Sequence, residues 1–470
     1  MSGLLNALGT AASALNAQTQ ALNVVSNNIA NVNNPNYSGE TANFTDLGMV
    51  ETSDGPQSIG LTVNVSQARS AVLDQMVRQQ TSLTSGFTAQ QSLLQQAQAA
   101  LGENITSSSS SSSGSTTATE TGLSSSINAF FNSFESLAAN PTDQGSKETV
   151  VEQAAVLTDR FQQIDTNLAQ VQSNAVAQAT DGVATANNLL QQVATLNTQI
   201  ASFEVNTPGS AVDLRDQREG DLEQLAALMP VTVQENAQGE DTVTAAAAAG
   251  GNVSLVSNGS VTNPLSYAAG TISAGSTALD LTSGTLSGAI ATSTGPVQTL
   301  RDNLDALVKQ IVTSVNTAYN PGSTVGGNFF DASGTTAATI ALDPGLSSAT
   351  LVAGAGYAGD NSIALAVAGV ANQQFSSAGG DSIDGTVDQF YANTTSNIGQ
   401  ALDTANTQVT DQTNVQTIVT NQRNSVSGVS LDQEMSHLLT YQTAYQATSE
   451  LFATINTMMS QLVTALTSAP

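Results

Sequence analysis

The stretch ALNVVSNNIANVNNPNYSG, residues 21–39, begins as an amphipathic helix and ends in a run of asparagines around one proline. No Lys, Arg, Asp or Glu occurs from Met1 to Gly39. Asparagine and proline favour turns and helix ends, so the sequence predicts that the first helix stops within residues 27–35. An uncharged helix of this length can pack against other protein without the cost of burying charge.

Apolar side chains recur every seven residues at both ends of the chain. The repeat in the first helix consists of Leu8, Leu15, Leu22 and Ile29, with a second line of Leu4, Ala11 and Val25 in which Gln18 is the polar exception. The C-terminal repeat consists of Leu431, Leu438, Tyr445, Phe452, Met459 and Leu466, with a second line of Tyr441, Ile455 and Leu462 interrupted by Glu434 and Thr448. A strict seven-residue repeat is typical of coiled coils, although ordinary helical core gives similar stripes. We therefore predict that the N- and C-terminal helices pair with each other.

The composition excludes several classes of protein. The 470 residues carry a formal charge of −28 with only nine Lys and Arg, which argues against nucleic acid or an anionic membrane as a partner. Cysteine is absent and His437 is the single histidine, so cysteine-based sites and histidine-rich metal sites are excluded. Tryptophan is absent and aromatic residues make up 4%, which favours long packed helices over a compact enzyme.

The first residues, MSGLLNALGTAASALN, lack the basic and unbroken apolar regions of a cleaved secretory signal. The sequence also lacks an apolar run long enough for a transmembrane helix. We expect no membrane insertion, and export, if it occurs, by another route.

Between its ends the chain alternates helical and extended patterns. Residues 40–66 predict an extended connector, helical periodicity returns at 72–101, and a Ser-rich loop follows at 106–120. A long helical region is expected to be interrupted near Asp181–Gly182, and the Thr/Val/Gly-rich segment 231–290 predicts a small β domain.

The predicted fold is mainly α with a β insertion: an elongated, multi-domain, nested chain whose paired terminal helices enclose a long helical bundle, which encloses a small outer β domain. The predicted domains are 1–39 plus 428–470 for the terminal coiled coil, 40–228 plus 296–427 for the helical rod, which includes a mixed Gly/Ala-rich part at 321–385, and 229–295 for the outer β domain.

No motif indicates catalysis, a cofactor or a metal. His437 has the spacing of an exposed helical residue, and no G-x-S-x-G, phosphate-binding or calcium-loop pattern is present. The densest charged segment runs from Asp213 to Glu223. Because Arg215 and Glu219 stand four residues apart, we interpret it as ion pairs along one helix surface rather than as a reactive cluster.

The two ends resemble the rod, hook and hook-associated proteins of the bacterial flagellum. The N-terminal signature of that family is matched at Ser26, Asn27, Asn28, Ile29, Ala30, Asn31, Asn33, Pro35, Tyr37 and Ser38, with departures at Asn34, Asn36 and Gly39. The segment SGVSLDQEMSHLLTYQTAYQA, residues 427–447, is similar to the end of the proteins that join hook to filament. Internal segments such as DLRDQREGDLEQLA agree with them, so the resemblance spans nearly the whole chain.

The resemblance implies a structural subunit that polymerises at the hook–filament junction, with the terminal helices lining the inner tube. The expected partners are further copies in a helical or ring assembly, the flagellar hook protein, the second junction protein on the filament side and an export chaperone. The expected location is extracellular, after export without a cleaved signal. The residues expected to carry assembly are the two seven-residue repeats and the turn at Asn31, Asn33, Pro35 and Tyr37.

Two alternatives remain at this stage. A rod or hook subunit shares the N-terminal signature, but Tyr441–Ala447 and the chain length argue against it. An extracellular adhesin or hydrolase that uses the β domain ranks lower, because residues 231–295 contain one aromatic side chain, Tyr267. We also predict that the terminal helices are unordered before assembly, because each lacks its neighbours in the single chain.

Overall fold

The computed structural model describes residues 2–46, 48–52, 55–58, 60–102, 122–323 and 327–467. These residues are mainly helical with small antiparallel sheets, which confirms the predicted fold class. The predicted Ser-rich loop at 106–120 lies outside the described residues.

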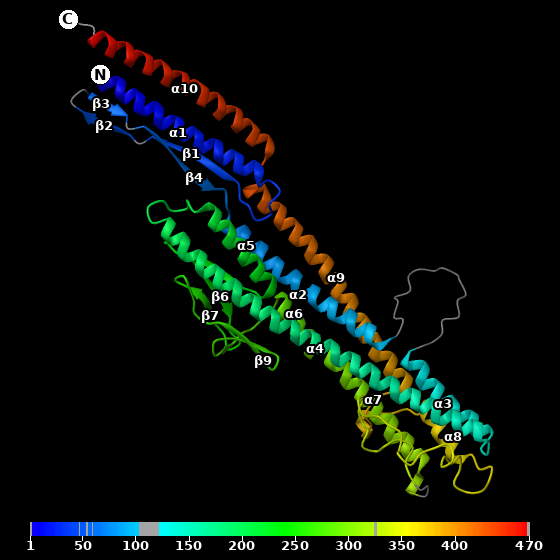
Figure 1. Ribbon diagram of the computed structural model, residues 1–470. Coiled ribbons are helices and arrows are strands. Elements are labelled where there is room, and N and C mark those ends of the chain that lie inside the picture. The colour runs from blue at the N-terminus through cyan, green and yellow to red at the C-terminus, as the bar shows by residue number, and fades with distance from the viewer. Residues whose placement is uncertain are drawn as a thin grey trace, which may run out of the picture. The chain divides into compact units, whose positions relative to one another are not determined.

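The chain divides into two compact units, and the boundary falls within long continuous helices (Figure 1). Unit 1 consists of Met1–Thr84, Val183–Gly284 and Gln412–Pro470, and unit 2 of Ser85–Gly182 and Thr285–Asp411. The helices that contribute to both are α2 (Ala71–Leu101), α4 (Gln144–Phe203) and α9 (Val387–Ser427). The three domains proposed from the sequence remain a prediction.

Within unit 1, the two ends of the chain lie side by side. Helix α1 (Ser2–Ala30) packs lengthwise on α10 (Leu431–Thr467) (Figure 1). The connector forms a hairpin of β1 (Glu40–Asp46) and β4 (Leu61–Gln67), which are antiparallel with Glu40 opposite Gln67 and cover another face of α1. A second hairpin joins β2 (Met49–Thr52) to β3 (Gly55–Ser58).

The remainder of unit 1 combines helix α5 (Val212–Leu228) with two small sheets. One sheet has the order β5-β6-β7-β8 and the other β11-β10-β9, and all strand neighbours are antiparallel. Their strands are β5 (Thr232–Glu235), β6 (Asp241–Ala246), β7 (Asn252–Ser257), β8 (Ser260–Val261), β9 (Leu265–Ala268), β10 (Thr271–Ala274) and β11 (Thr277–Ala278).

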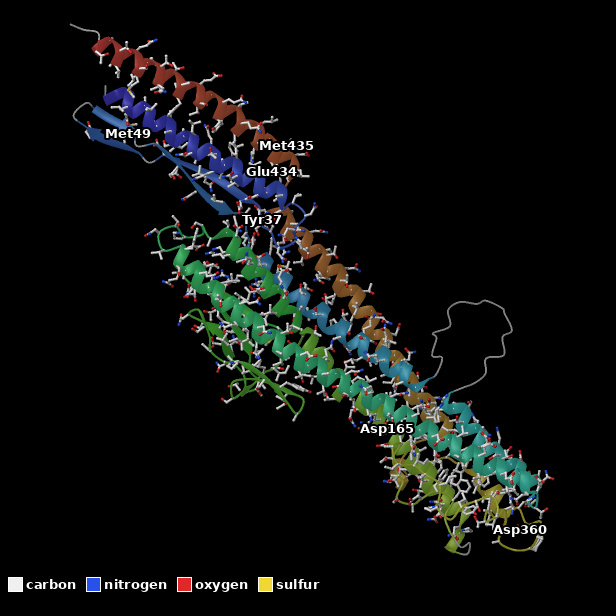
Figure 2. The ribbon with its side chains drawn as sticks, viewed as in Figure 1. Tyr37, Met49, Asp165, Asp360, Glu434 and Met435 are labelled. Atoms are coloured by element: carbon white, nitrogen blue, oxygen red, sulfur yellow. The ribbon has the colours of Figure 1, made fainter. Side chains whose placement is uncertain are left out.

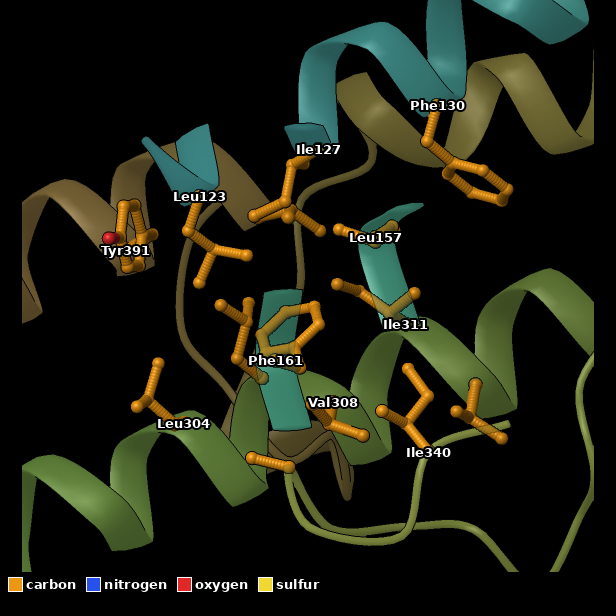
Figure 3. Close-up of a cluster of buried hydrophobic side chains, with 14 of the residues drawn as sticks. Leu123, Ile127, Phe130, Leu157, Phe161, Leu304, Val308, Ile311, Ile340 and Tyr391 are labelled. Carbon is orange, nitrogen blue, oxygen red and sulfur yellow. The ribbon is translucent and has the colours of Figure 1, made fainter. Parts of the chain in front are cut away.

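Unit 2 is built around one apolar core (Figure 3). It contains α3 (Leu123–Ala139), α6 (Gly284–Thr294), α7 (Pro296–Tyr319) and α8 (Ser362–Gly369), with short 3-10 turns at Pro321–Ser323, Val370–Asn372 and Ser377–Gly379. Pro296 suits the first turn of α7 because its ring fixes a helical φ. The ring centroids of Phe130 and Phe329 lie 5.7 Å apart, and Phe161 is fully buried.

Two local predictions are wrong. Helix α4 continues through Asp181–Gly182, where the buried neighbours Ala179 and Val183 supply packing that offsets the helix cost of glycine. Residues Gly284–Thr294, assigned to the β domain, form helix α6. A Cβ on Gly288 would lie 2.1 Å from the carbonyl oxygen of Gly86, so this glycine permits a close backbone approach that the sequence pattern does not reveal.

The core of unit 2 gives a stability prediction. Replacing fully buried Phe161 with alanine removes apolar contacts and leaves a cavity, so we expect a loss of about 3–5 kcal/mol in the free energy of unfolding. The measurement is denaturant unfolding followed by circular dichroism. The control is Val156→Ala on the same helix, where the side chain is 47% exposed and the expected change is below about 1 kcal/mol. Equal effects of the two variants would contradict the assigned core.

Candidate assembly interface

Helices α1 and α10 meet along their second apolar lines, which contain the polar exceptions Gln18 and Thr448. They do not meet along the regular seven-residue repeats. The Gln18 amide donates a hydrogen bond to the Thr448 hydroxyl at 3.1 Å, so the polar exceptions of the two second lines meet each other. Around this bond Ala11, Val25 and Ile455 are buried. The pairing of the terminal helices is therefore confirmed, and the second lines form its seam.

The regular repeat of α10 is only partly covered in the single chain. Leu431 is 48% and Tyr445 40% exposed, while Leu438, Phe452 and Met459 are half-buried. In α1 the corresponding side chains, Leu8, Leu15, Leu22 and Ile29, are also half-buried, and the side chain of Leu466 lies outside the described part. Other exposed apolar side chains on α10 are Met435, Leu439, Leu451, Met458 and Val463, together with Leu462 at the far end of the seam line. Helix α10 thus presents a second apolar line to its surroundings.

The exit from α1 is fixed by one buried amide, Asn28, which is 1% exposed. Its oxygen accepts hydrogen bonds from the Tyr37 hydroxyl at 2.8 Å and from the Glu40 backbone N–H at 2.9 Å. Its nitrogen donates to the Glu40 carbonyl at 2.8 Å. Three hydrogen bonds at a buried position hold both ends of the turn against the helix, and they direct the chain into β1.

The residues after this turn are attached to the rest of unit 1. The backbone N–H of Ser38 donates to the Asp216 carboxylate on α5 at 3.0 Å. The N–H of Gly39 donates to the Ser427 carbonyl at the end of α9 at 2.7 Å. Arg423 on α9 pairs with Glu223 on α5 and reaches the Pro35 carbonyl. The turn therefore connects the terminal helices to α5 and α9.

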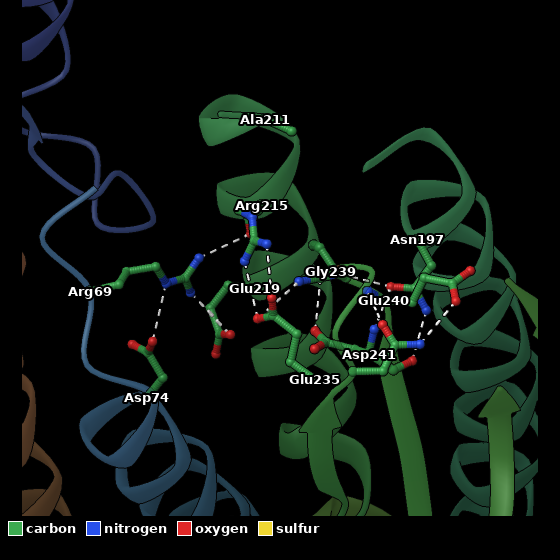
Figure 4. Close-up of polar contacts among 12 residues, drawn as sticks. Arg69, Asp74, Asn197, Ala211, Arg215, Glu219, Glu235, Gly239, Glu240 and Asp241 are labelled. Carbon is green, nitrogen blue, oxygen red and sulfur yellow. Dashed lines mark hydrogen bonds and ion pairs between the residues drawn. The ribbon is translucent and has the colours of Figure 1, made fainter. Parts of the chain in front are cut away.

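Helix α5 carries a network of tertiary ion pairs, and the predicted pair between Arg215 and Glu219 is wrong (Figure 4). Arg215 instead binds Glu204, which follows α4, at 2.8 Å and Glu235 at 2.8 Å. Arg218 binds Asp241 on β6 at 2.8 Å. The side chains point away from their own helix toward three other elements, so the charged segment holds unit 1 together.

The other side of α5 holds the segment that follows β4. Arg69 contacts Glu219 at 3.1 Å, Asp74 on α2 at 3.1 Å and Asp216 at 3.6 Å. Arg78 on α2 also pairs with Glu219. These side chains are mostly buried, and removing one partner of such a pair leaves an uncompensated charge that costs about 3–5 kcal/mol.

The pKa values of two carboxyl groups, Glu204 and Glu40, are shifted in opposite directions by their neighbours in unit 1. Burial alone would raise the pKa of Glu204, but hydrogen bonds from Arg215 and from the backbone of Gly209 and Ala211 lower it to about 2. For Glu40, burial and then the negative charges of Asp213 and Asp216 raise the pKa to about 7. Burial and the neighbouring Glu40 also raise the pKa of Tyr37. The turn therefore sits beside an excess of negative charge.

The turn residues expected to carry assembly differ in their surroundings. Tyr37 and Asn31 are half-buried, whereas Asn33 and Pro35 are exposed. Glu434, whose position in the α10 repeat suggested an interruption, is 8% exposed and lies in the first turns of that helix (Figure 2). His437 is exposed, and its ring centroid lies 5.9 Å from that of Tyr441.

Sequence reasoning missed the roles of Asn28, Asp216 and Arg423. One signal was available for Asn28, because it continues the buried face of α1 that includes Ala17, Ala21 and Val24. A polar residue on a buried face needs hydrogen-bond partners. The partners of Asp216 and Arg423 lie far away in the sequence, so no local pattern could identify them.

Three family models match this chain. The model described as flagellar hook-associated protein FlgK helical domain matches residues 110–330. The ends match the flagella basal body rod protein at 8–37 and the C-terminal model of the flagellar basal body rod FlgEFG proteins at 420–465. None of the described helices is long and apolar enough to cross a membrane.

Relatives with curated names are similar along the chain. Flagellar hook-associated protein 1 of Bacillus subtilis is 25% identical over 527 aligned positions that cover 99% of both chains. The protein of the same name from Salmonella typhimurium is 28% identical over 50% of this chain and 39% of its own length. The flagellar hook junction protein FlgK from Burkholderia pseudomallei aligns in structure over 55% of this chain and 46% of its own, at 22% identity and a TM-score of 0.46.

Matches to rod-protein models at both ends, beside paired terminal helices, define an axial protein of the bacterial flagellum. With a hook-associated helical-domain model matching residues 110–330 between those ends and a relative aligned over 99% of both chains, the chain is similar along its length to flagellar hook-associated protein 1.

The buried amide at the exit of α1 gives a prediction. Replacing Asn28 with alanine leaves the Glu40 backbone groups without their partners, so we expect a loss of about 1–3 kcal/mol in local stability. Hydrogen exchange of the Glu40 amide measures it and should be faster in the variant. Asn23→Ala, an exposed position on the same helix, should leave this exchange unchanged. Unchanged protection in both variants would contradict the assigned role of Asn28.

Glu40 gives a pH prediction. Its pKa in the folded chain, about 7, is above its ordinary value of 4.5, so the proton it binds stabilises the fold below pH 4.5 and this contribution is lost as pH rises through 7. Glu40→Gln imitates the protonated group and should lessen the fall in unfolding temperature between pH 5 and pH 8.

Glu450→Gln is the control for this experiment, because it removes an exposed carboxylate on α10. This control variant should show the same decrease in unfolding temperature between pH 5 and pH 8 as the unaltered chain. If Glu40→Gln shows that same fall, Glu40 does not titrate in this range.

Proposed function

We propose that this chain is a structural subunit of the hook–filament junction, where it joins hook to filament by assembling with copies of itself and with its flagellar neighbours. The alignment with hook-associated protein 1 over 99% of both chains carries this conclusion. The rod-protein matches at both ends support an axial position in the flagellum.

The terminal helices are the proposed means of assembly. Helix α10 uses one apolar line against α1 and leaves another exposed, which is the arrangement expected of a subunit whose contacts are completed by its neighbours. Helix α1 carries no charged residue, and the last charged residue of α10 is Glu450. Apart from Asp432, Glu434 and Glu450 on α10, these helices can therefore be packed into a tube without burying unpaired carboxylates. We also propose that they become fully ordered only on assembly.

We also propose which proteins this chain contacts and how it is exported from the cell. The hook protein on one side and the second junction protein on the other are the proposed neighbours, and an export chaperone is proposed to keep the terminal helices apart before export. Export without a cleaved signal and an extracellular location follow from a place in the flagellum. We propose that the chain acts by assembly alone and catalyses no reaction.

Deleting the gene in its native host tests this function. We expect hooks without filaments and filament subunits shed into the medium, and complementation with the same gene should restore filaments. Missing hooks would place the protein in the rod or hook instead. Unchanged motility in a host without a second copy would contradict the proposal.

A substitution separates contacts within the chain from contacts between chains. Leu439 is 61% exposed, so Leu439→Asp should leave the unfolding temperature unchanged and yet prevent incorporation into flagella. Leu22→Asp and Phe452→Asp should prevent incorporation as well, and because these side chains are half-buried they should also lower stability. Asn456→Asp, at an exposed polar site on α10, should be incorporated normally. Normal incorporation of Leu439→Asp would contradict a role for the exposed apolar side chains of α10 in assembly.

A further inference from the structure

A groove of about 560 Å³ runs between α4 and α5 in unit 1. Its most deeply buried lining residues are Leu196 and Gly220. Its other lining residues are Asn36, Gln191, Gln192, Thr195, Gln199, Gln217, Asp221 and Gln224. A Cβ on Gly220 would lie 2.9 Å from the side-chain nitrogen of Asn36, so the exposed Asn36 side chain would have to shift to make room for it. The groove therefore has a small apolar floor within a rim of amides.

The rim has free hydrogen-bonding capacity. Within the described part of the chain, the side-chain amides of Gln191, Gln192, Gln199 and Gln217 make no hydrogen bond to other protein groups. Each amide offers two donors and an acceptor, so the rim is suited to a partner that carries amides or hydroxyls. The only charged residue in the lining is Asp221, whose pKa is raised by burial.

A surface of matching chemistry lies on α9 in the same unit. Ile418 is 66% exposed and is the most exposed large apolar side chain of this helix. Helical spacing places Asn414, Val415, Asn421 and Gln422 around it, and all four are exposed. We call these five residues the Ile418 patch. It has one apolar centre and amides at its edge, as the groove does.

We propose that the groove of one copy receives the Ile418 patch of a second copy. The apolar centre would cover Leu196, while the amides of the two surfaces would exchange hydrogen bonds around it, which is the usual arrangement of an apolar centre within a polar rim. Neither surface contains Lys or Arg, so the contact buries no ion pair, and it must leave the Asp221 carboxylate at the rim in contact with water. This inference rests on the proposed function, because it supplies a side-to-side contact for the assembly.

The geometry of one chain favours a second copy over self-closure. Arg423 holds α9 to α5 through Glu223, and with that pair formed Ile418 remains exposed. Groove and patch are different surfaces, so the contact between copies is heterologous, and a pair of copies still has one free groove and one free patch. Repeated contacts of this type generate rings or helices, which is the form of assembly that an axial protein needs.

The chain contains no cysteine, so introduced cysteines can trap the contact without background. Thr195→Cys in the groove and Asn421→Cys in the patch would be combined in one gene that replaces the native copy. Isolated flagella would be treated with a short bis-maleimide linker and separated by denaturing electrophoresis. We expect a ladder of dimers, trimers and larger species from the double variant and only monomers from either single variant.

The matched control combines Asn421→Cys with Thr180→Cys, which is exposed on the same helix but about 22 Å from Thr195 along its axis. It should give no ladder. Dimers from Thr195→Cys alone would indicate that two grooves face each other and would overturn the proposal. Flagella that contain the double variant but give no ladder would also overturn it. Absence of the unaltered protein from isolated flagella would instead contradict the proposed function.

A second measurement tests the apolar centre without cysteine. Ile418→Ser should weaken retention of the protein in washed flagella about tenfold, since it removes most of the apolar surface that the contact buries. Val176→Ser, which alters a 46% exposed side chain on α4, should not change retention. Equal retention of all three proteins would overturn the role of Ile418.

Discussion

The buried charges of α5 are the constraint on which the rest of unit 1 depends. This helix of 17 residues pairs with the segment after α4, with the β5–β6 hairpin, with α2 and with α9. Buried ion pairs contribute little net stability compared with apolar packing, but a broken pair is strongly unfavourable. Any arrangement that separates one of these arginines from its carboxylate therefore leaves a buried charge unpaired and is unfavourable. In a unit whose core is made mostly of Leu, Val and Ala, this penalty fixes which elements meet.

The same constraint reaches the ends of the chain. Asp216 on α5 accepts a hydrogen bond from Ser38, and Arg423 joins α5 to the helix that leads into α10. Between them, Asn28 sets the direction in which the chain leaves α1. The terminal helices are thus anchored at one end by polar contacts, while the regular apolar repeat of α10 stays partly exposed. Polar groups decide the position of these helices, and in the assembly we propose their exposed apolar surface would supply the affinity for neighbours.

How far the sequence could predict this arrangement depends on the range of each interaction. Local periodicity predicted α1, α10 and their pairing, because a seven-residue repeat is a property of one helix. It did not predict which line forms the seam, since Gln18 and Thr448 look unfavourable until each is seen to bind the other. The pair of Arg215 with Glu204 and Glu235 was missed for a similar reason. A spacing of four residues suggested Glu219, and only the folded chain shows nearer carboxylates.

The placement of charge also explains why such an acidic chain can assemble. Only nine residues are basic, and Arg69, Arg78, Arg215, Arg218 and Arg423 are used inside unit 1. Few cations are therefore left to form ion pairs between copies, and contacts must rely on apolar centres and amides. Surfaces of this kind are weakly affected by salt, because screening acts on charges and not on apolar burial. An assembly joined by such contacts would therefore be less sensitive to ionic strength than one joined by ion pairs.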